Sequence, residues 1–225
     1  MRLTRHRAPA DGQDPFERRF GLKRGRLPPA VRAAVDTLMA ETSMLAQENA
    51  DLLDKLAIAQ ALADRDPLVP VFNRRALLRE LKRVISYIER YRTQAAVLFL
   101  DMDGFKAIND NFGHAVGDAA LAHVARLLLQ QVRDSDIVGR VGGDEFAVVL
   151  ANAPAEEARR KAQGLTALIA ETPFVHEGVR HRLAASIGVH AFTGAGVEDA
   201  ETLIARADEA MFAAKHAARA RLAVG

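Results

Sequence analysis

The sequence contains no cysteine and no tryptophan, and aromatic residues make up only 5% of it. Without cysteine there can be no disulfide framework, no thiol nucleophile and no cysteine-ligated zinc site. The scarcity of aromatic rings argues against a stacking surface for single-stranded nucleic acid, so no nucleic-acid partner is expected. A chain without cysteine fits a reducing compartment, and we therefore expect a cytoplasmic location.

Long apolar runs and a strong excess of one charge are also missing. The longest apolar stretches, 95–100 and 146–151, are far shorter than the roughly 18 residues that suggest a membrane span. No apolar segment of the signal-peptide kind follows Met1. The 31 Lys+Arg nearly balance the 29 Asp+Glu, which excludes a disordered polyelectrolyte. The 225 residues, 49% of them hydrophobic, are enough for one or two domains with a buried core.

Residues 1–28 carry most of the positive charge, with eight Lys/Arg against three acids. They contain several prolines and glycines and show no periodic apolar face, so we expect a flexible basic arm. Such an arm is either a solvated tail or a docking segment for a protein or an anionic surface. In the second case Phe16, Phe20 and Leu22 are candidate anchors.

A heptad pattern runs through residues 31–63 without Gly or Pro. It places Val35, Thr42, Asn49 and Leu56 at a positions, and Leu38, Leu45, Leu52 and Ala59 at d positions. Residues 29–63 are therefore predicted to form one helix, about 50 Å long over the heptads. A stripe this narrow needs a partner helix in water. A single Asn at a, with Leu at d, favours a parallel homodimeric coiled coil. The alternative is a helix that packs on the chain's own globular domain.

The remaining residues, 64–225, alternate between strand and helix patterns. Strands are predicted at 95–100, 136–141, 146–151 and 180–191, and helices at 115–132, 155–170 and 197–217. Helices that separate single strands, with one hairpin in the middle, indicate an α/β (α+β) fold. In this fold a sheet containing antiparallel pairs is flanked by helices.

Acidic residues lie at the ends of two of these predicted strands. Asp101 directly follows the apolar run 95–100, a position where oxygen ligands can hold a hard cation. Asp144 and Glu145 follow the two glycines of the hairpin. Adjacent like charges are costly unless a cation neutralises them. On its own, each stretch is equally consistent with an ordinary turn or a helix cap.

Two further pairs of polar residues are candidates for nucleotide binding. Asn109 and Asp118 either cap the helix near them or together pair with the edge of a guanine base. Lys215 and Arg219 lie one helical turn apart near the end of the last predicted helix. There they either complement the helix dipole or clamp a phosphate group.

Taken together, these motifs resemble the GGDEF family of diguanylate cyclases over roughly residues 64–219. The stretch 140–146, Arg-Val-Gly-Gly-Asp-Glu-Phe, resembles the family's signature hairpin. The stretches 66–75, 101–109, 112–118 and 207–219 resemble, in order, the family's D-x-L-T-G-L-x-N-R-R, D-x-D-x-F-K-x-x-N, F-G-H-x-x-G-D and A-D-x-A-[LM]-Y-x-A-K-x-x-G-R motifs. The chain departs from the family pattern at Val69, Pro70, Val71, Gly104, Phe212, Ala218 and Ala220.

The resemblance implies the palm-like sheet of the nucleotidyl cyclases and a metal site within it. Asp101, Glu145 and the carbonyl group of Met102 would hold Mg²⁺, or Mn²⁺ in its place. Asp144 would add a second carboxylate, either for the metal or to deprotonate the attacking hydroxyl. Asp144 and Glu145 are thus the expected catalytic residues.

The resemblance also implies how GTP would bind. Asn109 and Asp118 would recognise guanine, and Gly142 and Gly143 would leave room for the α-phosphate and ribose. The distal phosphates would be held by two backbone amides and two side chains, those of Phe105 and Lys106 and of Lys215 and Arg219 respectively.

Finally, Arg133 and Asp136 match the family's R-x-x-D inhibitory site, at which cyclic di-GMP would bind. The implied activity is the condensation of two GTP into cyclic di-GMP with release of two pyrophosphates. Each domain would hold one GTP, so a homodimer through residues 31–63 is expected, with feedback by the product. The alternative is a catalytically silent receptor or scaffold that binds GTP or cyclic di-GMP.

Overall fold

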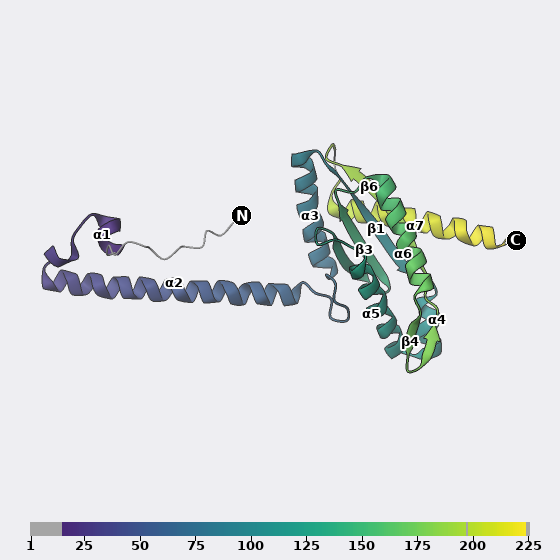
Figure 1. Ribbon diagram of the computed structural model, residues 1–225, viewed down its shortest axis with the longest axis horizontal. Helices are drawn as coiled ribbons and strands as arrows, with labels where there is room; N and C mark the ends of the chain where they lie inside the picture. Colours follow the sequence, from purple (N-terminus) through teal and green to yellow (C-terminus); the bar gives the residue numbers. More distant parts are fainter. Residues whose placement is uncertain (1–14, 197, 224–225) are drawn as a thin grey trace. The chain divides into compact units, whose positions relative to one another are not determined.

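The computed structural model describes residues 15–196 and 198–223, with most of their side chains up to residue 216. The chain divides into two compact units, Met1–Gln60 and Ala61–Gly225 (Figure 1). No helix of the described part is long and apolar enough to cross a membrane.

The first unit consists mainly of α2 (Pro29–Ala63), whose last turn continues into the second unit. The prediction of a single helix over these residues is confirmed. The d-position side chains of Leu38, Leu45 and Leu52 are 60%, 62% and 56% exposed. Among the described residues, nothing covers this stripe.

Two short elements precede α2, namely α1 (Pro15–Phe20) and the 3₁₀ turn η1 (Arg24–Arg26). Arg24 forms an ion pair with Asp36 of α2 at 3.1 Å and lies over the ring of Phe16. Part of the predicted basic arm therefore has regular structure. Segments of six and three residues are too short to show a periodicity, which is why the sequence pattern does not reveal them. The flexibility of the arm stays a prediction.

The second unit contains a four-stranded sheet in the order β2-β3-β1-β6, with every neighbouring pair antiparallel. Its strands are β1 (Gln94–Met102), β2 (Ile137–Gly142), β3 (Glu145–Ala151) and β6 (Ala185–Thr193). A separate hairpin is formed by β4 (Phe174–His176) and β5 (Val179–His181). The predicted α/β fold with antiparallel pairs and helical cover is confirmed.

Five helices accompany the sheet. They are α3 (Arg74–Tyr91), α4 (Phe105–Phe112), α5 (His114–Gln130), α6 (Ala155–Glu171) and α7 (Ala200–Ala223). Because side chains alternate along a strand, β1 feeds two separate cores. Leu98 and Leu100 pack with residues of α5 and α6, whereas Val97 and Phe99 pack with residues of α3 and α7. The sheet is therefore buried between two helical layers.

Three details differ from the predicted elements. The predicted strand 180–191 is two strands, β5 and β6, separated by residues 182–184. The last helix begins at Ala200 rather than at residue 197. The helices α3 and α4 and the strand β4 are not predicted by the pattern.

Candidate active site

The first two acids of the predicted site lie on neighbouring strands. Asp101, near the end of β1, is the register partner of Glu145, the first residue of β3. Directly opposed residues of an antiparallel pair have Cβ atoms about 4.5–5.5 Å apart and share one face of the sheet. Both side chains are half-buried. Two carboxylates that are 44 positions apart in the chain thus become neighbours.

The hairpin between β2 and β3 carries the third acid. The strand register shifts between Arg140 and Gly142, and Gly143 adopts φ +49°, a left-handed conformation that favours glycine. The backbone carbonyl of Asp144 accepts a hydrogen bond from the Met102 amide at 3.4 Å. The hairpin tip is thereby attached to the end of β1.

Arg140, a residue of β2, holds this hairpin in place through hydrogen bonds. Its Nε and Nη2 atoms donate to the Gly143 carbonyl at 2.9 and 2.6 Å, and its Nη1 atom donates to Asp66 at 3.1 Å. The Arg140 and Asp66 side chains are only 16% and 12% exposed. Both residues lie in the stretches that resemble family motifs, but the motifs alone do not indicate a role for either. Their contact joins segments 74 positions apart, and no local pattern signals it.

The electrostatics of the hairpin favour a cation. Burial raises the pKa of Asp144, and the negative charge of Asp101 raises it further. Burial also raises the pKa of Glu145, and the charges of Asp208, Asp101 and Asp144 add to this effect. Carboxylates crowded in this way are stabilised by a positive ion beside them.

The ammonium group of Lys215 lies beside the acids at the end of β1. It pairs with Asp101, and with Asp103 at 3.2 Å. Ser186 holds Asp103 by donating to its carboxylate at 3.0 Å. Burial acts to lower the pKa of Lys215, but the hydrogen bonds that its ammonium group donates to Asp101 and Asp103 outweigh burial and raise the pKa. Lys215 is thus a counter-ion of Asp101 and Asp103.

A close approach of α7 to the sheet brings Lys215 to this position. A Cβ atom at Gly188 of β6 would lie 2.1 Å from the Met211 amide nitrogen and 2.2 Å from the Ala207 carbonyl oxygen. Only glycine leaves room for the helix backbone at this distance. The side chain of Arg219, predicted beside Lys215, lies outside the described residues.

The predicted guanine-binding residues lie near each other on α4 and α5. A Cβ atom at Gly117 would lie 1.9 Å from Oδ1 of Asn109, so the Asn109 side chain rests against the residue before Asp118. Phe105 and Lys106 open α4 after Gly104, which has φ +71°. Amides in the first turn of a helix have no partner within it and are suited to bind anions.

The donor set around Asp101 suits a divalent cation. Within the described residues, no three Asp, Glu or His side chains form a metal-binding group by themselves. Mg²⁺ is ordinarily held by one or two carboxylates together with water and substrate phosphates, not by a cage of protein ligands. Asp101, Glu145 and the Met102 carbonyl would offer oxygen ligands of this kind. The residues therefore fit a metal that binds together with a nucleotide.

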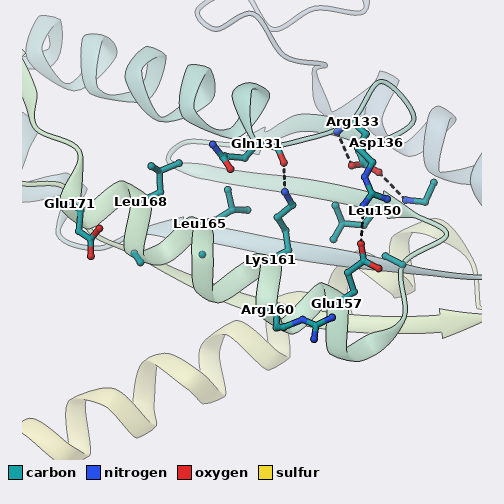
Figure 2. A pocket seen from close by; sticks show the side chains of 14 residues that line it. Gln131, Arg133, Asp136, Leu150, Glu157, Arg160, Lys161, Leu165, Leu168 and Glu171 are labelled. Carbon is teal, nitrogen blue, oxygen red and sulfur yellow. Dashed lines mark hydrogen bonds and ion pairs between the residues drawn. The ribbon is translucent and has the colours of Figure 1, made fainter.

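Arg133 and Asp136 lie apart from these acids, at the opposite end of β2. The Asp136 carboxylate accepts hydrogen bonds from the backbone amides of Arg133 at 3.0 Å and of Ala151 at 3.2 Å. The Arg133 guanidinium turns instead toward Glu157 of α6, with which it pairs at 3.1 Å (Figure 2). All three side chains line a pocket of about 530 Å³.

Comparison with known proteins connects this arrangement to one family. The family model described as "Diguanylate cyclase, GGDEF domain" matches residues 63–221. The chain is 40% identical to diguanylate cyclase DosC of Escherichia coli over 158 residues, which cover 70% of this chain and 34% of DosC. It is 34% identical to diguanylate cyclase DgcP of Pseudomonas aeruginosa over 194 residues, covering 86% of this chain and 29% of DgcP. The chain thus spans about a third or less of these curated relatives.

Solved structures show the same fold. The coiled coil and GGDEF domain of Caulobacter crescentus DgcB, in complex with c-di-GMP, matches with a TM-score of 0.70 at 24% identity. The match covers 80% of this chain and 95% of that one. Pseudomonas aeruginosa SiaD, in complex with its activator SiaC, matches with a TM-score of 0.66 at 26% identity, covering 84% of this chain and 73% of SiaD.

Proposed function

The chain belongs to the GGDEF family, and from this membership we propose that it is a diguanylate cyclase that condenses two GTP into cyclic di-GMP and releases two pyrophosphates. The observation that carries the proposal is the register pairing of Asp101 with Glu145 beside the Gly142-Gly143 turn. This pairing supports the proposal because it brings two carboxylates together, beside two glycines without bulky side chains.

In the proposed reaction, the 3′-hydroxyl of each GTP attacks the α-phosphorus of the other. Each attack forms one phosphodiester bond and releases one pyrophosphate, and the second attack closes the ring. Mg²⁺ or Mn²⁺, held by Asp101, Glu145 and the Met102 carbonyl, would neutralise charge that develops on the phosphate oxygens. Asp144 lies on the same hairpin and serves as a further carboxylate, either for the metal or to accept the proton of the attacking hydroxyl. These roles use the residues predicted from the sequence.

Nucleotide binding follows from the elements around the acids. Asn109 and Asp118 bind the guanine base, and the amides of Phe105 and Lys106 face the distal phosphates. Lys215 exchanges its carboxylate partners for phosphate oxygens when the nucleotide and its metal bind. This exchange of partners is supported by the position of the Lys215 ammonium group, which lies beside Asp101 and Asp103.

A second copy of the chain supplies the second GTP. We propose a parallel coiled coil through residues 31–63, in which the partner helix covers the exposed leucines of α2. Tethering two domains in this way raises the effective concentration of one half-site near the other. The similar DgcB fragment also combines a coiled coil with a GGDEF domain.

Two further features complete the proposal. Arg133 and Asp136 bind cyclic di-GMP and provide feedback inhibition, at the opposite end of β2 from the reaction. Residues 1–28 are either a solvated tail or a docking segment for a protein partner or an anionic surface, and activity and localisation assays after deletion of these residues would separate the two. A chain without cysteine that uses GTP is proposed to work in the cytoplasm.

The metal-site proposal is tested by comparing Glu145→Gln with Glu201→Gln, an exposed acid in the first turn of α7. Both variants and the wild type are incubated with GTP and Mg²⁺, and nucleotide products are separated and quantified. We expect Glu145→Gln to abolish cyclic di-GMP formation while the dimer persists, and Glu201→Gln to behave as the wild type. Full activity of Glu145→Gln would refute the assignment of the metal ligands.

A further inference from the structure

The two residues of the proposed inhibitory site are held very differently. Both oxygens of the Asp136 carboxylate accept backbone hydrogen bonds, one from Arg133 in the same turn and one from Ala151 at the end of β3, so this side chain is fixed in place. The Arg133 side chain is 71% exposed, and its guanidinium is held by Glu157 across the pocket (Figure 2). The fixed half of the site is therefore Asp136, and the adjustable half is Arg133.

Glu157 lies on a part of α6 that is held in position by other contacts. It lies in the first turn of α6, where the positive end of the helix dipole favours a carboxylate. Its side chain is 40% exposed, so it is partly withdrawn from solvent. A neighbouring contact, from Lys161 of α6 to the carbonyl group of Gln131, ties this part of α6 to the end of α5. Glu157 thus faces Arg133 from an anchored helix.

We propose that Glu157 competes with the phosphate groups of cyclic di-GMP for Arg133, and thereby sets the strength of product inhibition. This inference rests on the proposed function of Arg133 and Asp136. A phosphodiester is a strong alternative partner for the guanidinium, because Arg pairs with phosphate through two parallel hydrogen bonds. Binding of the product must therefore break the Arg133–Glu157 pair and leave a carboxylate beside an incoming negative charge.

The expected size of the effect follows from the exposure of the pair. An ion pair that is partly open to solvent changes an equilibrium by about 1.5- to 5-fold, and salt weakens it. Removing the charge of Glu157 also removes its repulsion of the phosphate. We therefore expect Glu157→Gln to tighten cyclic di-GMP binding about two- to fivefold.

The chain offers a matched control beside Glu157. Glu156 is the adjacent residue of α6, is exposed, and pairs with Arg159 rather than with Arg133. Cyclic di-GMP is titrated calorimetrically into the full-length wild type, Glu157→Gln, Glu156→Gln, Arg133→Ala and the Arg133→Ala/Glu157→Gln double variant. Glu157→Ala serves as a second neutral variant, and circular dichroism verifies that each protein is folded.

We expect both neutral variants of Glu157 to bind more tightly than the wild type, with a gain that shrinks at about 0.5 M salt. Glu156→Gln should bind as the wild type. The gain should disappear when Arg133 is already alanine, which a merely structural effect on α6 would not produce.

The outcomes separate the two levels of the proposal. If the wild type binds, Arg133→Ala weakens binding, and the Glu157 variants match the wild type, the competition is refuted while the inhibitory site stands. If Arg133→Ala binds as tightly as the wild type, or the wild type does not bind, the inhibitory site is refuted and the competition with it. A gain that persists without Arg133 also contradicts the competition.

Discussion

Replacing Arg140 by methionine should weaken both the fold and the proposed activity, because this side chain holds the hairpin between β2 and β3 in place. Its guanidinium makes two hydrogen bonds to the Gly143 carbonyl and one to the Asp66 carboxylate. The methionine side chain fills similar space but donates nothing. The change therefore removes the clamp with little loss of packing.

The structure sets the size of the loss. A hydrogen bond that involves a charged group contributes about 1.5–3 kcal/mol, and the two bonds to Gly143 share one acceptor. Asp66 would retain the amides of Leu68 at 2.9 Å and Val69 at 3.1 Å, so it is not left buried without partners. We therefore expect the unfolding free energy to fall by about 2–3 kcal/mol. This is at or below the low end of the range of about 3–5 kcal/mol for breaking a buried ion pair, because Asp66 keeps other partners. For a domain of this size the expected fall corresponds to about 4–12 °C in Tm.

The assay combines thermal unfolding with GTP turnover for wild type, Arg140→Met, Arg140→Lys and Arg90→Met, an exposed arginine of α3. Lysine keeps the charge but not the fork of donors, so it should recover only part of the stability. A hairpin without its clamp should lower kcat/KM by about tenfold or more, since small displacements of reacting groups are costly. The reasoning would be refuted if the unfolding free energy of Arg140→Met lay within about 0.5 kcal/mol of the wild-type value and its turnover were unchanged.

Three other outcomes are expected. Polar replacements of Leu45 and Leu52 should give monomers in sedimentation and little activity in turnover assays. Met44→Gln, which lies off the heptad stripe, should leave the dimer intact. Active monomers would contradict the role of the coiled coil. Arg133→Ala should relieve inhibition by cyclic di-GMP, and an unchanged inhibition curve would contradict the regulatory site. Burial holds the pKa of His123 below its ordinary value of 6.5, so near that pH the unfolded chain binds more protons than the folded chain and stability falls as the pH drops. The Tm of His123→Phe should therefore decline less than that of the wild type between about pH 7 and pH 5, and parallel declines would contradict this.

The elements that sequence patterns predict well are those with a strong local signal. The strand β1 and the helix α6 begin and end within two residues of the prediction, because one is a short, fully apolar run and the other has a single regular apolar stripe. The break at residues 182–184 was not predicted, since the apolar alternation continues through Leu183 although the chain leaves the sheet there. Burial of Leu183 reflects tertiary packing, which a local pattern cannot distinguish from a strand.

The candidate site shows the same division. Asp101 and Glu145 could be identified from their motifs, but their contact depends on the register of β1 against β3, which long-range pairing sets. The partners of the arginines had no sequence signal at all. Arg140 meets Asp66 across 74 positions, and Arg133 meets Glu157 across 24 positions. Such contacts exist only once the sheet and helices have assembled.

The most direct test of the whole account is the identity of what the purified chain makes from GTP. Incubation with GTP and Mg²⁺, followed by mass spectrometry and a pyrophosphate assay, should give cyclic di-GMP with two pyrophosphates for each product molecule, and a chelator should prevent both. Binding of GTP without any cyclic di-GMP would contradict the cyclase and identify the chain as a silent receptor.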